Sequence, residues 1–166
     1  MINRKIVLIG DYSTGKTSLI HRFVDNQFSD KYLSTIGVKI SRKNILSSEI
    51  ELRLMIWDIE GGTEAKPINN TYLIGAHGCI IVADLTRKQT IENINIYIKH
   101  IRDISPDAPL IIALNKSDCL EDNDTKKILQ TVIETYDDEA SYIYVTSAKS
   151  ANGVEVMFNA LAENTL

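Results

Sequence analysis

The feature that most constrains the fold is the nine-residue stretch GDYSTGKTS, which runs from Gly10 to Ser18. An apolar run, Ile6 to Ile9, precedes it, and the helix-like sequence SLIHRFV overlaps its end. The spacing is that of the Walker A loop, in which backbone N–H groups and a helix N-terminus cradle a polyphosphate. Lys16 is expected to reach the β- and γ-phosphates, and the Thr17 hydroxyl to hold Mg²⁺. The stretch therefore predicts a nucleotide phosphate site early in the chain.

The length and composition are those of a single soluble globular domain, which we expect to span residues 1–166. With 18 basic against 22 acidic residues and no long basic cluster, the net charge of −4 indicates that nucleic acid is not a partner. Cys79 and Cys119 have neither metal-ligand spacing nor the pattern of a disulfide framework, which is typical of a cytoplasmic protein. The apolar run near the N-terminus is too short for a signal peptide or a membrane span.

Short apolar runs alternate with helical patterns along the chain, which predicts an α/β fold with a mostly parallel sheet. After the run that precedes Gly10, strands are expected over residues 38–46, 50–57, 79–83, 110–114 and 142–145. The pair 38–46 and 50–57 is expected to form an antiparallel hairpin. Helices are expected over residues 16–25 and 123–136, along Ile91, Ile94, Ile98 and Ile101, from about Pro67 to Ile74, and along Val154, Met157, Phe158 and Leu161.

Polar and turn residues fill positions 26–37, which we expect to form a loop beside the phosphate site. The second strand of the hairpin ends in the sequence WDIEGG, residues 57–62. An acidic residue at the end of a buried strand beside a phosphate loop is where Mg²⁺ is held through water, so Asp58 is a candidate metal residue. A solvent-facing strand end with a flexible turn is the alternative interpretation.

Two loops that follow the late strands indicate which base is bound. The sequence NKSD occupies residues 115–118, and TSAK occupies residues 146–149. An aspartate can accept hydrogen bonds from both the N1–H and the exocyclic amine of guanine, whereas adenine offers no such pair of donors. Asp118 is therefore expected to select guanine, while the backbone N–H of Ala148 donates to guanine O6.

Together these motifs resemble those of the Ras superfamily of small GTPases, and the whole chain is most similar to the Rab branch. The resemblance rests on GDYSTGKT, on TIG at residues 35–37, and on WDIEGG, YLIGAHG, NKSD and TSAK. It implies a P-loop GTPase fold with a six-stranded, mostly parallel sheet, one antiparallel edge strand and about five helices. It also implies Mg²⁺-dependent binding of GTP and GDP, with two switch loops that respond to loss of the γ-phosphate.

The resemblance also assigns roles by position. Phe28 would lie against the guanine, Tyr32 would cover the phosphates, and the backbone N–H of Gly61 would bind the γ-phosphate. The implied Mg²⁺ residues are Thr17, Thr35 and Asp58. The implied catalytic residues are Lys16, Thr35, Gly61 and Gly62. The implied nucleotide-binding residues are Asp11, Tyr12, Ser13, Thr14, Gly15, Lys16, Thr17, Ser18, Phe28, Tyr32, Thr35, Gly61, Asn115, Lys116, Asp118, Ser147, Ala148 and Lys149.

Partner proteins are implied by the same resemblance. Effectors, exchange factors and activating proteins would bind the switch regions, at about residues 30–40 and 59–75. Ile40, Trp57 and Tyr72 would form the hydrophobic effector triad of Rab proteins, whose first member is usually phenylalanine. The effector surface is therefore expected to differ from that of other Rab proteins.

The sequence departs from the family pattern where hydrolysis is catalysed. The family usually has Asp-Thr-Ala-Gly-Gln where this chain has Asp-Ile-Glu-Gly-Gly, so Gly62 replaces the glutamine that orients the attacking water. Because phosphoryl transfer depends on positioning and electrostatics, we expect very slow hydrolysis. A Gly62→Gln change would raise the rate if the rest of the site is competent, and a partner's glutamine could supply the missing group. The bulk of Tyr12 is expected to crowd an activating arginine. Glu60 would repel the γ-phosphate if it pointed inward, or would orient water or face solvent.

These departures leave a second function open, a pseudo-GTPase scaffold that holds nucleotide constitutively. A third function, an adenine-specific P-loop ATPase or kinase, is opposed by Asp118. The last residues up to Leu166, AENTL, include no cysteine that could be prenylated. Peripheral membrane association is therefore expected only if a lipidated tail lies beyond that residue.

Overall fold

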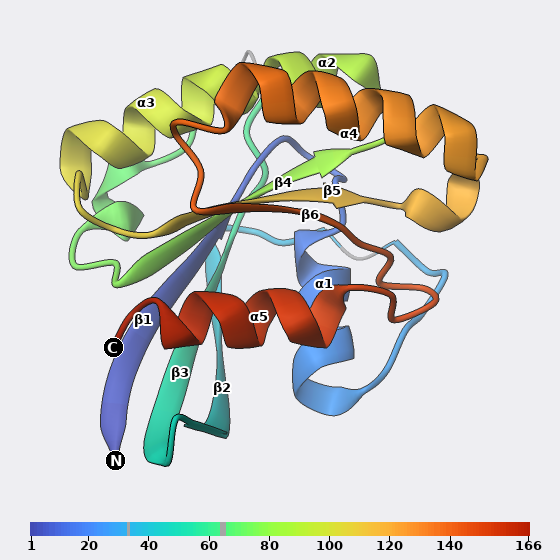
Figure 1. Cartoon of the computed structure of the whole chain (residues 1–166). Helices are drawn as coiled ribbons and strands as arrows, with labels where there is room; N and C mark the ends of the chain where they lie inside the picture. The colour runs from blue at the N-terminus through green and yellow to red at the C-terminus, as the bar shows by residue number, and fades with distance from the viewer. Residues whose placement is uncertain (33, 64–65) are drawn as a thin grey trace.

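The chain folds around a six-stranded sheet in the computed structural model, which describes residues 1–32, 34–63 and 66–166. The strands are β1 (Ile2–Ile9), β2 (Val38–Ser47), β3 (Ile50–Ile59), β4 (Gly78–Asp84), β5 (Leu110–Asn115) and β6 (Tyr142–Val145). They lie in the order β2-β3-β1-β4-β5-β6, and the pair β2–β3 at one edge is antiparallel while the other pairs are parallel (Figure 1). The expected fold class is confirmed.

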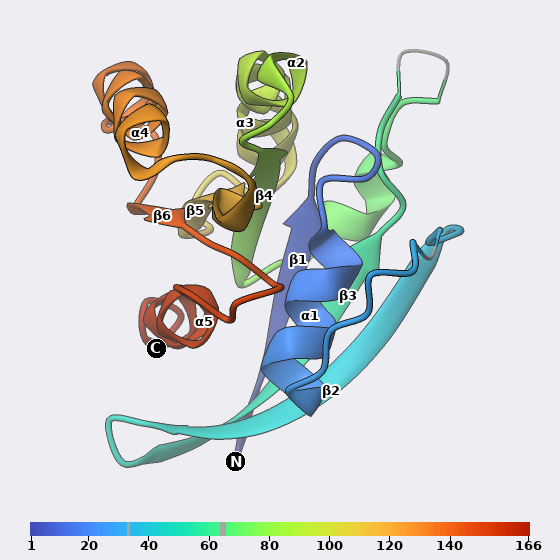
Figure 2. The same cartoon turned by 90° about the vertical axis from the view of Figure 1, so that its right-hand side faces the viewer.

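Helices cover both faces of the sheet. Within the described ranges they are α1 (Lys16–Asp25), α2 (Lys88–Glu92), α3 (Ile94–Ile104), α4 (Asp122–Tyr136) and α5 (Val154–Glu163), with the 3₁₀ turns η1 (Asn70–Leu73) and η2 (Ser117–Cys119). Figure 2 shows α1 and α5 on one face, and α2, α3 and α4 on the other. The end of β1 accordingly faces two cores: Ile6 and Leu8 pack beneath α1 and α5, whereas Val7 and Ile9 pack beneath α3.

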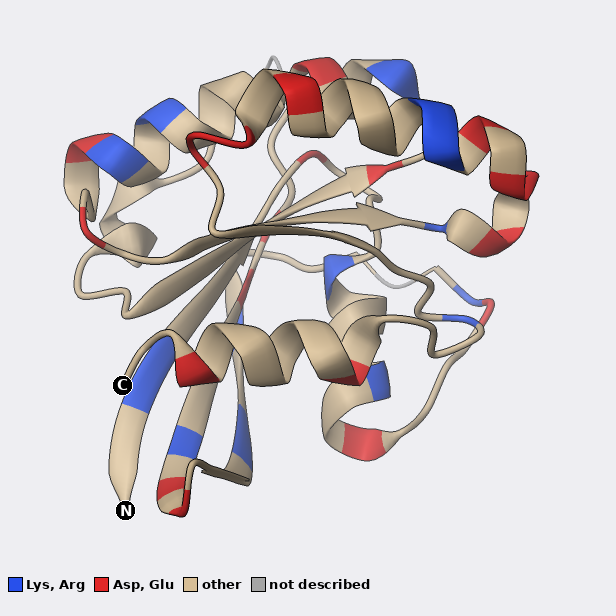
Figure 3. Ribbon diagram, in the orientation of Figure 1, with Lys and Arg blue, Asp and Glu red and all other residues tan. Residues whose placement is uncertain are grey.

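A strand that is buried on both faces must be apolar at successive positions, which is why the runs in β1, β4 and β5 are unbroken. Figure 3 shows charged residues on the helices, in the loops and along β1, β2 and β3, while β5 and β6 carry none. Because β1, β3, β4, β5 and β6 run in the same direction, their carboxyl ends meet at one edge of the sheet. The phosphate loop leaves β1 in the middle of this edge, between β3 and β4, where ligands bind in open α/β sheets.

The structure differs from the sequence-based expectations between residues 67 and 104. The helix expected along Ile91 to Ile101 is two helices, α2 and α3, which meet at Asn93. The Asn93 side chain donates to the Asp11 carboxylate at 2.8 Å, a contact across 82 residues that periodicity cannot reveal. The helix expected to end near Ile74 is the single 3₁₀ turn η1. The expected switch regions, at about residues 30–40 and 59–75, include residues 33, 64 and 65, which lie outside the described residues. Within the described ranges, no helix is both long enough and apolar enough to cross a bilayer.

Candidate nucleotide-binding site

A cavity of about 430 Å³ opens at the carboxyl edge of the sheet, beside the start of α1. Its walls come from the phosphate loop, α1, the loop before β2, and the loops that follow β3, β5 and β6. The lining residues are Tyr12, Ser13, Gly15, Lys16, Thr17, Ser18, His21, Phe28, Ser29, Asp30, Lys31, Tyr32, Thr35, Ile59, Gly61, Asn115, Lys116, Asp118, Cys119, Ala148 and Lys149. Segments far apart in the sequence therefore share one pocket.

Lys16 supplies a buried positive charge to this cavity. The side chain begins α1, only 5% of the residue is exposed, and its Nζ donates to the carbonyl oxygens of Asp11 at 2.8 Å and Gly10 at 3.2 Å. Burial lowers the pKa of Lys16 to about 8, because a low-dielectric environment disfavours the charged form. Neutral carbonyl oxygens only partly compensate a buried ammonium, so the site favours an anionic ligand.

Gly15, the residue before Lys16, shows why the loop requires glycine. Its φ of +97° lies in the left-handed region, and a Cβ there would collide with the Asn115 side-chain amide. That amide nitrogen donates to the Thr14 carbonyl at 3.0 Å, and the Asn115 oxygen accepts from Thr146 at 3.1 Å. Asn115 thus joins the phosphate loop to the two loops that were expected to recognise the base.

Three oxygen-bearing side chains converge at the phosphate end of the cavity. Thr17 Oγ1 lies 2.6 Å from Thr35 Oγ1 and donates to Asp58 Oδ2 at 2.6 Å, and Thr35 donates to the same oxygen at 3.2 Å. Asp58 Oδ1 is buried and has no hydrogen-bond partner in the described part of the chain. Burial raises the pKa of Asp58 against the opposing effect of its hydroxyl partners and Lys16. An oxygen-only set with an unsatisfied buried carboxylate oxygen fits a hard cation such as Mg²⁺.

Asp118 lies at the opposite end of the cavity. Its Oδ1 accepts a hydrogen bond from Ser147 Oγ at 2.7 Å. Partial burial acts to raise the pKa of Asp118, but hydrogen bonds from Ser147 and Cys119 outweigh it and hold the pKa below its usual range. The carboxylate is therefore ionised at neutral pH and acts as an acceptor.

Lys116 adds a second link between the two ends of the site. Its Nζ donates to the Ser13 carbonyl at 2.9 Å and lies 2.7 Å from the buried Asp84 carboxylate at the end of β4. Burial acts to raise the pKa of Asp84, but hydrogen bonds from Lys116 and Thr86 keep it lowered. The ammonium of Lys116 is thus fixed against the phosphate loop, which leaves its aliphatic stem along the cavity wall.

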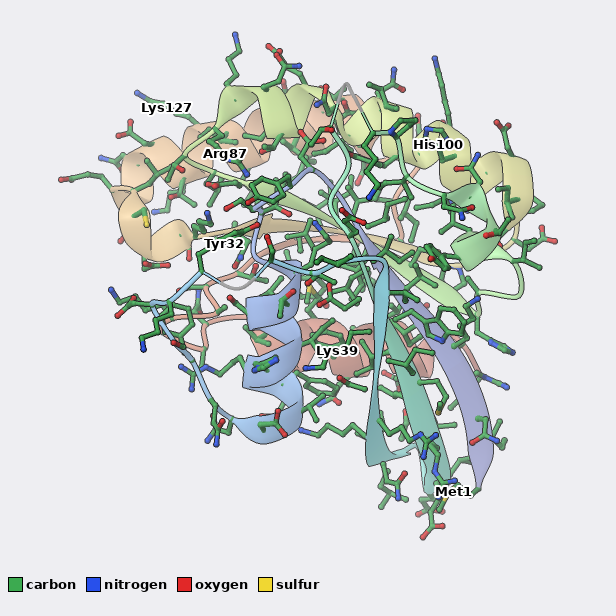
Figure 4. All side chains as sticks on the ribbon, turned by 180° about the vertical axis from the view of Figure 1, so that it is seen from behind. Met1, Tyr32, Lys39, Arg87, His100 and Lys127 are labelled. Carbon is green, nitrogen blue, oxygen red and sulfur yellow. The ribbon has the colours of Figure 1, made fainter. Side chains whose placement is uncertain are left out.

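Two tyrosines stand at the mouth of the cavity. The rings of Tyr12 and Tyr32 are 5.4 Å apart and meet edge to face, and both residues are about half exposed. Hydrogen bonds with Tyr32 and Ser34 lower the pKa of Tyr12. Arg87 donates to the Tyr12 carbonyl at 2.7 Å, and Figure 4 labels Tyr32 and Arg87 on this side of the molecule. The bulk at position 12 therefore lies over the phosphate end, beside Tyr32.

Gly62 is hydrogen-bonded to the phosphate loop. Its N–H donates to the Gly10 carbonyl at 3.1 Å, and its carbonyl accepts from the Tyr12 N–H at 3.1 Å. A Cβ at Gly62 would lie 2.7 Å from the hydroxyl of Tyr97, which donates to the Asp11 carboxylate. A side chain at this position must displace the Tyr97 hydroxyl, so the expected gain in hydrolysis from Gly62→Gln stays a prediction that depends on this shift.

Most predicted site residues line the cavity, but five do not. Asp11, Thr14, Asp58, Gly62 and Ser147 lie behind the lining, and each bonds to a neighbour in or near the phosphate and base loops. The lining residues that the sequence analysis missed are His21, Ser29, Asp30, Lys31, Ile59 and Cys119. Most are sequence neighbours of predicted residues. His21 lies one helical turn beyond Thr17 and Ser18, and this helical spacing could have predicted its place in the cavity.

Comparison with known proteins bears on the same motifs. The sequence model of the Ras family matches residues 5–166. GTP-binding protein YPTM2 of Zea mays is 34% identical over 160 residues, which cover 95% of this chain and 77% of that protein. Ras-related protein RABA1c of Arabidopsis thaliana is 34% identical over 165 residues, covering 96% and 72%. Ras-related protein Rab-1C of Dictyostelium discoideum is 35% identical over 162 residues, covering 96% and 79%. The chain therefore belongs to the Ras family, as a Rab-like small GTPase, which confirms the resemblance drawn from its motifs.

Proposed function

We propose that this protein is a guanine-nucleotide switch that binds GTP and GDP with Mg²⁺, hydrolyses GTP very slowly, and presents its switch loops to partner proteins. The observation that carries the proposal is the pairing, in one cavity, of a buried ammonium at Lys16 with an ionised acceptor at Asp118. A ligand that satisfies both has polyphosphate at one end and adjacent N–H donors at the other. GTP and GDP have this composition.

The phosphate end supports binding and charge neutralisation. Lys16 and the backbone N–H groups at the start of α1 would hold the β- and γ-phosphates, and Thr35 and the Gly61 N–H would contact the γ-phosphate. Mg²⁺ would be held by Thr17 and Thr35, with Asp58 as a direct or water-mediated partner, and would neutralise charge on the transferred group. With the cation bound, the Asp58 carboxylate would interact with Mg²⁺ or with a Mg²⁺-bound water instead of with the hydroxyls of Thr17 and Thr35.

Slow hydrolysis is expected because position 62 is occupied by glycine. A glycine offers no side chain to orient water, and Gly62 is also fixed by its two hydrogen bonds to the phosphate loop. Single-turnover hydrolysis of GTP by Mg²⁺-loaded protein tests this point. We expect a rate below that of Ras, which is on the order of 10⁻⁴ s⁻¹. A rate equal to or above that value would contradict the proposal.

A pseudo-GTPase scaffold is the second candidate function. It is favoured by Glu60, whose carboxylate accepts a hydrogen bond from Gly37 in the loop before β2 and does not line the nucleotide cavity. A contact away from the nucleotide would hold this loop in the same way with GDP and with GTP. A scaffold would bind its partner equally with GDP and with a GTP analogue, whereas a switch would discriminate between them. Partners are proposed to bind the surface of Ile40, Trp57 and Tyr72, where the Trp57 and Tyr72 rings are 6.4 Å apart.

A further inference from the structure

Glu60 joins the two switch loops to each other. The Gly37 N–H donates to Glu60 Oε2 at 3.0 Å, and the Glu60 N–H donates to the Gly37 carbonyl at 2.8 Å. Lys66 Nζ donates to both carboxylate oxygens at 3.0 Å. The hydrogen bond from Gly37 and those from Lys66 lower the pKa of Glu60, so the carboxylate is ionised at neutral pH. The concern that this charge would repel a γ-phosphate does not apply to the observed orientation.

The contact is an extension of the sheet. In the β2–β3 hairpin, Val38 pairs with Ile59, and Gly37 and Glu60 are the next residues along the two chains. The reciprocal position of these residues continues the antiparallel ladder beyond its last regular pair, and the carboxylate adds a bond that an alanine at this position cannot make. The hairpin is ten residues long on each strand and therefore provides a rigid base for the extension.

The bonds of Glu60 differ in strength. The Lys66 side chain is 68% exposed, and ion pairs in such surroundings contribute little. The Glu60 side chain is 27% exposed, and its bond from the Gly37 N–H is charge-assisted, which makes it the stronger of the two. The contact between Gly37 and Glu60 is therefore expected to persist when Lys66 is removed.

None of these bonds involves a group expected to contact the nucleotide. The proposed sensor of the γ-phosphate, Thr35, lies two residues before Gly37 and bonds instead to Thr17 and Asp58. We propose that Glu60 is a positioning residue that holds Gly37 against the end of β3 in both nucleotide states. Loss of the γ-phosphate then rearranges the loop before Gly37, while the pairing of Gly37 with Glu60 at the end of the sheet is retained. This inference rests on the proposed function, because it concerns the GDP and GTP states.

Hydrogen exchange of the Gly37 amide tests the proposal. The chain has eight glycines, so protein labelled with ¹⁵N-glycine gives few amide signals. The amide would be followed with GDP and with a non-hydrolysable GTP analogue, both with Mg²⁺. In the unsubstituted protein we expect the two exchange rates to agree within about twofold. In Glu60→Ala, which restores the residue usual in the family, we expect exchange with GDP to become at least about tenfold faster than with the analogue.

Lys66→Ala is the matched control, because it removes the exposed ion pair and leaves the bond from Gly37; its two rates should agree as in the unsubstituted protein. Fluorescence of Trp57, the single tryptophan, supplies a second measurement, and should change on nucleotide exchange more in Glu60→Ala than in the unsubstituted protein. If Glu60→Ala does not fold, Glu60→Gln keeps an acceptor without the charge, and its Gly37 amide should exchange faster than that of the unsubstituted protein with GDP.

A tenfold difference between nucleotides in the unsubstituted protein, or identical behaviour of the Glu60 variant and the unsubstituted protein, would overturn the proposal. Chromatography of the nucleotide released from each sample separates this outcome from failure of the proposed function. Samples without bound guanine nucleotide would refute that function. Samples that are fully loaded but show nucleotide-dependent exchange at Gly37 would refute only the role of Glu60.

Discussion

Burial shifts the pKa values of two side chains in opposite directions, and their positions decide what the shift means. Lys16 is a cation whose pKa burial lowers to about 8, and it lies in the wall of a cavity where an anion can restore its charge. Cys79 is fully buried in β4, and burial raises the pKa of its thiol to about 12. The first shift prepares a binding residue, whereas the second reflects only the apolar core.

The titration of Cys79 predicts how stability depends on pH. An unfolded chain releases the thiol proton above a pKa of about 9, while the folded chain keeps it up to about 12. Between these values the unfolded state binds fewer protons, so stability falls as pH rises. From pH 8 to pH 10, urea denaturation should show a loss about 1.4 kcal/mol larger for the unsubstituted protein than for Cys79→Ala. Parallel pH profiles for the two proteins would contradict this prediction.

At the scale of secondary structure, the sequence predicts the elements and loops that depend on local patterns of residues, but not the contacts between distant segments. The strands, α1, α4 and α5 were predictable because their apolar periods are regular and the sheet buries both faces. The phosphate and base loops were predictable because each requires particular residues at fixed spacing. Three contacts were not predictable, since each joins residues that come close together only after folding. They are the hydrogen bond of Gly62 to Gly10, the bond of Asn93 to Asp11 at the break between α2 and α3, and the bond between Glu60 and Gly37.

The segment after β3 yields a prediction about restoring hydrolysis. A side chain at Gly62 meets the Tyr97 hydroxyl, which Asp11 holds in place. Gly62→Gln alone should therefore lower the thermal midpoint by several degrees without raising the single-turnover rate. Gly62→Gln with Tyr97→Phe removes the colliding oxygen, and should raise the rate at least about tenfold over Tyr97→Phe alone, the matched control. A faster rate in Gly62→Gln alone would show that Tyr97 does not block the position.

At the scale of the whole molecule, the strand order creates the site. With β1 between β3 and β4, the phosphate loop leaves the sheet between the hairpin that carries Asp58 and the strands that carry the base loops. Asn115 and Lys116 then bond across to Thr14 and Ser13, more than 100 residues earlier in the chain. The distance between the phosphate and base ends is thus fixed by the sheet, which suits one ligand that spans both.

Displacement of a fluorescent GDP from Mg²⁺-loaded protein by unlabelled GDP or ADP tests the central claim most directly. Because a site built to pair with guanine donors leaves Asp118 unpaired when adenine enters, GDP should displace the probe at concentrations at least about 10³-fold lower than ADP. Asp118→Asn should reduce this ratio at least about tenfold, since the amide offers one acceptor and an opposing donor. Asp137→Asn, at the exposed end of α4, should leave the ratio unchanged. Equal displacement by GDP and ADP would contradict the assignment of this cavity to a guanine nucleotide.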